Sequence, residues 1–149
     1  MCLDIKNSLH TTKFGLKNPY IASKNKVVYK AILEEEPGQY ITPFMGVKLE
    51  FDSDGAAVQI TDGDLEIKGS LYNGYRVEKG VHGFKSEKAA QKYMHLVVCS
   101  ISQPAAQYLE EHTKICKAII PKGEKFYYGT RGDIVATKMI VYEPKEHEE

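Results

Sequence analysis

The chain has 149 residues, of which 42% are hydrophobic and 27% are charged, so its composition is that of an ordinary globular domain. A single domain of this length buries about 70% of the surface of its unfolded chain, so we predict one domain over residues 1–149. The 20 basic and 20 acidic side chains cancel. This balance removes the main argument for non-specific binding to nucleic acid or membranes, and it leaves little charge repulsion against homo-oligomers.

The three cysteines, Cys2, Cys99 and Cys116, have no C-x-x-C spacing, which argues against a disulfide framework and against a zinc site. The sequence contains neither an apolar signal segment nor a run of membrane-spanning length, so we expect a cytoplasmic protein without a membrane partner. If Met1 were removed, Cys2 would carry a free amine beside its thiol, as in N-terminal nucleophile enzymes. Cysteine is more often a buried hydrophobic residue, and we prefer that interpretation.

The first half of the chain predicts a series of strands. Lys26–Leu33 is rich in Val, Ile and Tyr, and it is followed by an acidic run and by Pro37-Gly38, which favour a turn. Further short apolar or alternating segments, separated by Gly, Asp and Ser, predict further strands. These are Gln39–Pro43, Val47–Phe51, Ala56–Ile60, Leu65–Ile67 and Tyr72–Val77. Ala56–Ile60 and Leu65–Ile67 flank the turn at residues 61–64, which predicts a hairpin.

Two helices are predicted next. Ser86 is a suitable cap for a main helix that begins at Glu87, and apolar residues at three- and four-residue steps extend this helix to about Ile101. The alternative is a strand over Leu96–Ile101, because this run is also β-prone. Pro104 is permitted at the first position of a short second helix, which is predicted to run from about residue 104 to His112.

The last third of the chain organises the predicted fold. Two β-rich runs, Ile115–Ile120 and Ile134–Tyr142, flank a polar segment with glycines, which predicts strands joined by a turn over Lys122–Arg131. Residues 143–149 form a charged tail that we expect to fray. The order of strands, helices and strands predicts an α+β domain with a mainly antiparallel sheet.

The candidate binding residues lie in three segments. His82 stands between two glycines just before the helix cap, where an imidazole near a helix N-terminus suits an anion; the alternative is that it hydrogen-bonds a neighbouring carbonyl and fixes the loop. The Lys122–Arg131 turn interleaves basic and aromatic residues, which can hold a phosphate and stack a planar group. The alternative is an ordinary turn with solvated lysines. Together with the first predicted strand, these segments predict one binding face, made of Tyr29, Lys30, His82, Lys122, Lys125, Tyr127, Tyr128 and Arg131.

Several motifs occur in an order that resembles a family of small uncharacterised proteins of gut-type anaerobic bacteria and their phages. The motifs are the Met-Cys-Leu-x-Ile start, Val28-Tyr-Lys30, Ile41-Thr-Pro-Phe44, Gly80-Val-His-Gly-Phe84, and Ile120-Pro-Lys-Gly123 with Tyr127-Tyr-Gly129. Two of these motifs also resemble a domain of unknown function that follows pentapeptide repeats in giant-virus proteins. The resemblance implies a phage or bacterial setting, with the host cytoplasm as the location if a phage encodes the protein, and it implies no known activity.

A second resemblance is to small ADP-ribosyltransferases, whose last strands often run through a Pro-x-Gly-x-x-Phe turn, as residues 121–126 do here. It would imply a transferase that uses NAD. The sequence departs from that family where glutamates are expected, because Ile115, Cys116 and Lys117 stand there, and Tyr29-Lys30 stands where an arginine is usual. A carboxylate is what stabilises an oxocarbenium-like centre, so its absence favours binding over transfer.

We therefore expect a non-catalytic binding module of phage or bacterial origin that recognises a small phosphorylated or nucleotide-like ligand, or a protein partner. One alternative is a divergent ADP-ribosyltransferase-like enzyme. The second alternative is a structural or assembly component of a virion. No catalytic residue, cofactor or metal site is predicted, since the histidines and cysteines have no metal-ligand spacing and the aspartates of residues 52–64 belong to two separate turns.

Overall fold

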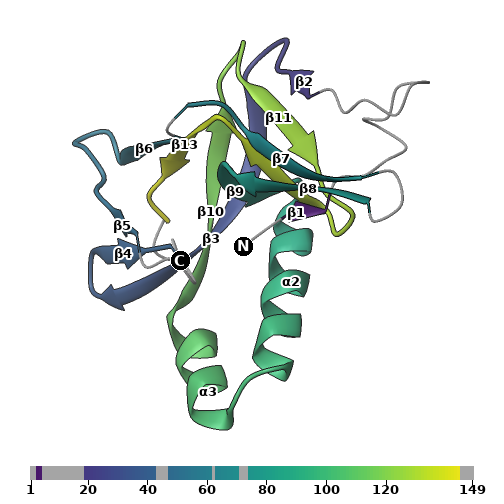
Figure 1. Cartoon of the computed structure of the whole chain (residues 1–149). Helices are drawn as coiled ribbons and strands as arrows, with labels where there is room; N and C mark the ends of the chain where they lie inside the picture. Colours follow the sequence, from purple (N-terminus) through teal and green to yellow (C-terminus); the bar gives the residue numbers. More distant parts are fainter. Residues whose placement is uncertain (1–2, 5–18, 43–46, 62, 71–73, 145–149) are drawn as a thin grey trace.

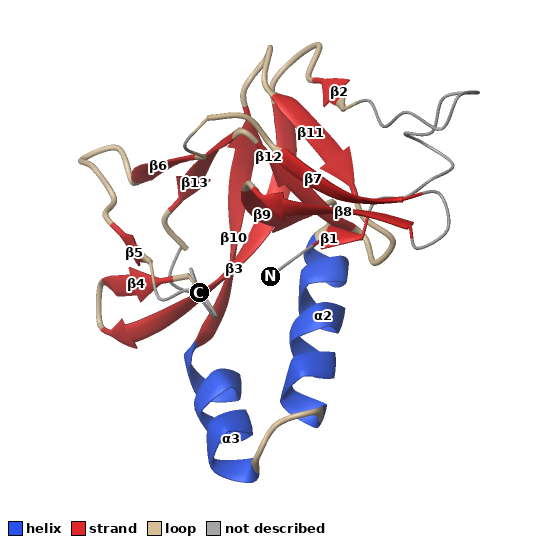
Figure 2. Cartoon of the chain, in the orientation of Figure 1, coloured by secondary structure: helices blue, strands red, loops and turns tan. Residues whose placement is uncertain are grey.

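The computed structural model describes residues 3–4, 19–42, 47–61, 63–70 and 74–144 (Figure 1). It is a mostly antiparallel β structure with two helices, which confirms the predicted α+β class. In Figure 2 the helices lie together at one end of the strands.

Most strands belong to one large sheet, in the order β2-β11-β12-β9-β3-β10-β13-β6, with β4 attached to β3 and β5 attached to β4. Its strands are β2 (Tyr20–Ile21), β3 (Lys26–Glu36), β4 (Gln39–Ile41), β5 (Lys48–Leu49), β6 (Ala56–Ile60), β9 (Val81–Phe84), β10 (Thr113–Ile120), β11 (Lys125–Tyr128), β12 (Asp133–Ala136) and β13 (Lys138–Tyr142). A smaller sheet has the order β1-β8-β7. Its strands are β1 (Leu3–Asp4), β7 (Glu66–Ser70) and β8 (Gly74–Lys79).

The centre of the large sheet is the antiparallel pair of β3 and β10, which runs from Thr113↔Leu33 to Ile120↔Lys26. Alternate residues of a strand share a face, and one face of this pair is apolar except for the buried Lys30. Val28, Ile32 and Ala118 on this face are fully buried. They pack in one core cluster with residues of β9, β11, β12 and β13, so most of the sheet contributes to a single core.

The large sheet is curled, which brings strands that are not neighbours close together. A Cβ atom built on Gly83 of β9 would lie 3.0 Å from Met139 Cε of β13, although β3 and β10 separate these strands in the sheet. The small sheet packs against another part of the same structure, where Val77 of β8 forms a buried cluster with Tyr127 and Val135.

The helices α2 (Glu87–Cys99) and α3 (Gln103–His112) follow β9 directly. The Ser86 hydroxyl accepts a hydrogen bond from the Ala89 N–H at 3.0 Å, which confirms the predicted cap. The helix α2 ends two residues before the predicted Ile101, so the strand alternative for Leu96–Ile101 is wrong. Within the described part of the chain, neither helix is long and apolar enough to cross a membrane.

Two segments that were predicted as a loop and a turn are strands in the structure. Val81–Phe84 forms β9, which pairs along its length with β12, and Lys125–Tyr128 forms β11, which pairs with β12 on its other side. The predicted run Ile134–Tyr142 is also interrupted at Thr137 and forms two strands. The glycines near both segments also signal turns, and β9 depends on partners far away in the sequence, so the local pattern gave the wrong prediction.

The predicted hairpin of Ala56–Ile60 with Leu65–Ile67 is also wrong. The strand β6 covers the predicted residues but pairs with β13, while β7 pairs with β8 in the smaller sheet. The remaining predicted strands are present with shifted ends, and β3 extends three residues further than Leu33. Pro43, Tyr72 and the charged tail from residue 145 lie outside the described residues.

Gly80 links the two sheets at a point where no larger residue fits. Its φ is +154°, and an added Cβ would lie 2.4 Å from Val135 Cγ2 and 2.7 Å from Leu65 Cδ2. We therefore expect Gly80→Ala to lower the free energy of unfolding by about 2–4 kcal/mol, through overpacking and backbone strain together. Urea unfolding measures this change.

The matched control is Gly38→Ala. Gly38 has a φ of +81°, but an added Cβ would meet nothing within 4 Å. It should cost only about 1 kcal/mol, because the backbone strain acts there without a clash. Equal losses in the two variants would contradict the packing explanation for Gly80.

Candidate functional site

A cavity of about 800 Å³ opens beside the middle of β3. One edge of β3 is shared by two strands, because β9 pairs with it at Tyr29↔Phe84 and β4 pairs with it from Leu33 onward. Between these contacts, residues 30–32 have no strand partner on that edge within the described chain. We call this interruption the fork, and the space beside it the central cavity, whose walls come from β3, β5, β6, β9, α2 and the residues next to β4.

Lys30 lies at the fork and contributes a buried amine to the wall of the central cavity. Only 6% of the residue is exposed, and its Nζ donates a hydrogen bond to the His82 carbonyl oxygen at 2.5 Å. A continued β3–β9 register would place His82 opposite Ala31, so the lysine satisfies a carbonyl that the diverging strands leave without a ladder partner. An ammonium has three donors, and the described residues use one of them.

No carboxylate of the described residues forms an ion pair with Lys30. Cys116 lies opposite it on β10, but burial raises the pKa of the Cys116 thiol to about 12, so the thiol stays neutral and provides no counter-charge. Burial lowers the pKa of Lys30 to about 8, which leaves it mostly protonated at neutral pH. The fork therefore holds a buried positive charge, which is costly unless something compensates it.

His82 extends the polar wall from β9. Burial lowers the pKa of His82 to about 4, and the positive charge of Lys30 contributes to the same direction. The ring is therefore neutral at physiological pH. Its Nδ1 atom is buried and has no hydrogen-bond partner among the described residues. Gln59 on β6 also lines the cavity, and its Oε1 atom is buried without a hydrogen-bond partner among the described residues.

The rest of the cavity lining is apolar with a positive bias. Its charged side chains, among the described residues, are Lys30, Lys48 and Lys79 against Glu50. Lys79 also lies 3.9 Å from Glu66, outside the cavity. Apolar walls come from residues such as Leu49, Val81, Phe84 and Met94. A cavity of this size, with an apolar lining and a few converging polar groups, suits a ligand that has an apolar body and an anionic group.

The structure does not gather all the predicted site residues. Lys30 and His82 meet at the central cavity, whereas Tyr29, Lys122, Lys125, Tyr127, Tyr128 and Arg131 do not line it. Lys122 and Arg131 are exposed in the turns at opposite ends of β11. The three predicted segments belong to one sheet, in which β9 and β3 are neighbours and β12 separates β11 from β9, but the predicted side chains do not line one cavity. Ligand binding by these side chains stays a prediction.

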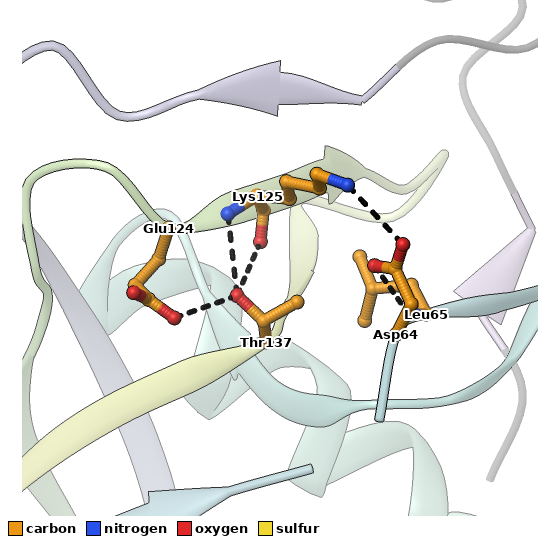
Figure 3. A network of polar contacts seen from close by, with 5 residues as sticks. All are labelled: Asp64, Leu65, Glu124, Lys125 and Thr137. Atoms are coloured by element: carbon orange, nitrogen blue, oxygen red, sulfur yellow. Dashed lines mark hydrogen bonds and ion pairs between the residues drawn. The ribbon is translucent and has the colours of Figure 1, made fainter. Parts of the chain in front are cut away.

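Lys125 is held in a separate polar network (Figure 3). Its Nζ lies 3.1 Å from Asp64 Oδ2, and its backbone N–H donates to Thr137 Oγ1 at 3.2 Å. The Thr137 hydroxyl donates in turn to Glu124 Oε1 at 2.9 Å. This network joins the start of β11 to the break between β12 and β13, which indicates a structural role for Lys125.

The two adjacent tyrosines of β11 lie on opposite faces of the strand. Tyr127 is 2% exposed and packs between the sheets, and burial raises its pKa to about 12. Tyr128 is half-buried on the other face, where its ring lies 5.7 Å from that of Tyr20 and the Nζ of Lys26 lies 5.3 Å above it. Tyr127 is thus a core residue, and Tyr128 contacts other aromatic and basic side chains.

Sequence reasoning missed Gln59, Lys48 and the cavity itself. Gln59 stands in an otherwise apolar strand, and this single polar residue was the available signal. No protein-family model matches the chain, and no curated protein or solved structure matches it either. The resemblances stated above therefore stay predictions. Among the described residues, no group of three or more His, Cys, Asp or Glu side chains could hold a metal ion.

The buried neutral His82 should make stability depend on pH. Its pKa is lower in the folded state than the ordinary 6.5, so the unfolded state binds more protons between about pH 4 and pH 6.5. Stability is therefore complete above this range and falls as the pH decreases through it, by up to about 3 kcal/mol for this group. Urea unfolding at several pH values should show a smaller acid loss for His82→Gln than for the wild type.

His95→Gln is the matched control, because His95 is exposed on α2. This variant should keep the acid loss of the wild type. An identical acid loss in His82→Gln would show that His82 does not titrate in this way.

Proposed function

We propose that the protein is a non-catalytic binding module, and that the central cavity binds a ligand with an apolar body and an anionic group. The observation that carries this proposal is the buried ammonium of Lys30, which has no carboxylate partner among the described residues. Perturbed ionisable groups in a cavity are typical of functional sites, because such groups are costly for stability alone. A ligand anion would provide the missing counter-charge and accept the unused donors of Lys30.

The other polar groups support binding of an anion rather than chemistry on it. At neutral pH Lys30 is mostly protonated and the thiol of Cys116 is fully protonated, and both forms are poor nucleophiles. Neutral His82 can donate or accept one hydrogen bond through a ring nitrogen, which suits the orientation of a bound group. Lys48 at the wall adds positive charge and attracts an anion from solution.

The replacement Lys30→Met tests the proposal with anilinonaphthalene sulfonate, a fluorescent probe that combines an apolar body with an anion. Loss of the charge-assisted contacts should weaken binding at least tenfold. The same replacement should leave the fold intact, because an apolar side chain of similar volume removes the desolvation cost of the charge, which offsets the lost hydrogen bond to the His82 carbonyl. Probe fluorescence and thermal unfolding measure the two effects.

Lys117→Met is the matched control, since Lys117 is exposed on the adjacent strand β10 and does not line the cavity. It should leave probe binding unchanged. Unchanged binding in Lys30→Met, with the fold intact, would overturn the proposed function.

Binding of the same probe should also weaken as the pH rises above about 8, where folded Lys30 loses its proton. We expect a loss of about tenfold per pH unit above the pKa if only the ammonium binds the anion. The titration of Lys30 does not unfold the protein in this pH range, so unfolding caused by Lys30 does not explain a loss of probe binding. Because its folded pKa is below the ordinary 10.5, Lys30 contributes increasing stability between about pH 8 and pH 10.5.

Lys30→Arg provides the comparison, because a guanidinium stays charged throughout this range. Probe binding to this variant should vary little with pH. If the wild type also shows no change up to about pH 10, the probe does not depend on the ammonium of Lys30.

A further inference from the structure

The edge strand β6 has hydrogen-bonding groups that point away from its partner β13. Glu143 N–H donates to Gly55 O at 2.8 Å, and Thr61 N–H donates to Thr137 O at 2.9 Å. The hydrogen bonds of an antiparallel pair involve alternate residues of each strand. Since Gly55 and Thr61 both bond toward β13, the odd-numbered residues between them, Ala57 and Gln59, bond to β13 as well. The backbone N–H and C=O groups of the even-numbered residues, Ala56, Val58 and Ile60, therefore point to the other side.

Ala56 already uses its outward groups in the turn before β6. Its N–H donates to Asp52 Oδ1 at 3.0 Å, and its carbonyl accepts from Asp52 N–H at 2.9 Å. Within the described chain, no hydrogen bond reaches the outward backbone groups of Val58 or Ile60. The open part of the edge therefore consists of two donor–acceptor pairs, spaced two residues apart.

These open groups face the central cavity. Residues 57–61 all line it, whereas no residue of β13 does, although β13 is the neighbour of β6 in the sheet. The cavity must therefore lie on the side of β6 that is opposite to β13. Lys30, Lys48 and Lys79 line the same cavity.

We propose that the central cavity receives an extended peptide segment, which adds as a strand to β6 at Val58 and Ile60 and places a carboxylate at Lys30. This inference rests on the proposed function and names its ligand class. Donor–acceptor pairs at a two-residue spacing match the repeat of an extended polypeptide. The side chains of Val58 and Ile60 are 60% and 69% exposed, so an apolar residue of the added strand would cover surface that is now in contact with water.

A free segment fits this site better than a second folded copy of the chain. The open edge lies within a cavity that has walls from β5, β9 and α2, so the edge of another folded sheet would have to pass these elements. The positive bias of the lining adds a preference for an acidic segment or for a free carboxyl terminus. These two sources of the carboxylate are separated in the experiment below.

The experiment selects ligands for the whole protein from a displayed library of random linear peptides of about ten residues, the length of a long strand. Selected peptides are then synthesised with free and with amidated carboxyl termini. Retained binding after amidation assigns the carboxylate to an acidic side chain, and loss assigns it to the terminus. Either way, Lys30→Met should weaken binding at least tenfold.

Val58→Pro removes an outward N–H that is not part of the β13 ladder, and proline is tolerated at an edge position of this kind. It should weaken peptide binding at least tenfold, and much more than it weakens the binding of anilinonaphthalene sulfonate, because the probe needs no backbone N–H of β6. Val58→Thr, which keeps the N–H and the branched side chain, should bind the peptides as the wild type does.

A second test needs no change in the protein and applies even if Val58→Pro does not fold. N-methylation of single amides along a selected peptide should abolish binding at alternate positions and be tolerated between them, since only one side of an added strand bonds to β6. Methylation effects without this alternation would overturn the proposal.

The remaining outcomes separate this inference from the proposed function. If the sulfonate probe binds through Lys30 but no peptide is enriched, strand addition is wrong and the binding proposal stands. If the probe does not bind either, the proposed function itself is wrong. A dimer that becomes monomeric in Val58→Pro would show that a second copy occupies β6, which also overturns the peptide proposal.

Discussion

The central cavity depends on how the edge of β3 is divided between two partners. Since β9 pairs with β3 only at Tyr29 and β4 pairs from Leu33, the chain must satisfy backbone groups that a continuous ladder would have bonded. A buried carbonyl without a partner costs about 1–3 kcal/mol, and Lys30 removes part of this cost by donating to His82 O. The same arrangement buries an ammonium, so the His82 carbonyl at the fork is satisfied while the charge is not. The unpaired positive charge of Lys30 is therefore the feature of the central cavity that favours an anion.

The curl of the large sheet determines what surrounds the fork. A Cβ atom on Gly83 would lie 3.0 Å from Met139 Cε and 3.0 Å from Tyr29 O, so glycine at this position favours the close approach of β9 and β13. This contact brings β13, and with it β6, round toward β9. The curled sheet remains open between β6 and β9, and the central cavity occupies that opening. Exposed sheet edges invite pairing with other chains, and the free part of the β6 edge lies beside the central cavity, where Val58 and Ile60 are largely exposed.

The sequence predicts the elements whose signals are local. The Ser86 cap, the apolar spacing of α2 and the β-branched run of β3 need no distant partner, and the structure confirms them. The strands β9 and β11 could not be predicted in this way, because the glycines around His82 and after Lys122 also signal turns. Lys30 and His82 were predicted as ligand-binding residues, but nothing in the sequence indicated that they are buried. Their burial follows from the fork, which depends on the pairing of β3 with β9, more than 50 residues away in the sequence, and this pairing leaves no local pattern.

The ionisation states around the fork explain why binding and folding are connected at this site. Burial lowers the pKa values of both Lys30 and His82, to about 8 and about 4, and raises that of Cys116 to about 12. At neutral pH the histidine and the cysteine are thus uncharged, and Lys30 carries the only charge of the three. A carboxylate or another anion in the cavity would stabilise this charge, so the pKa of Lys30 would move back toward its ordinary value in the complex. Since the cost of the buried ammonium is present in the free protein and removed in the complex, part of the affinity for an anion comes from relief of this cost.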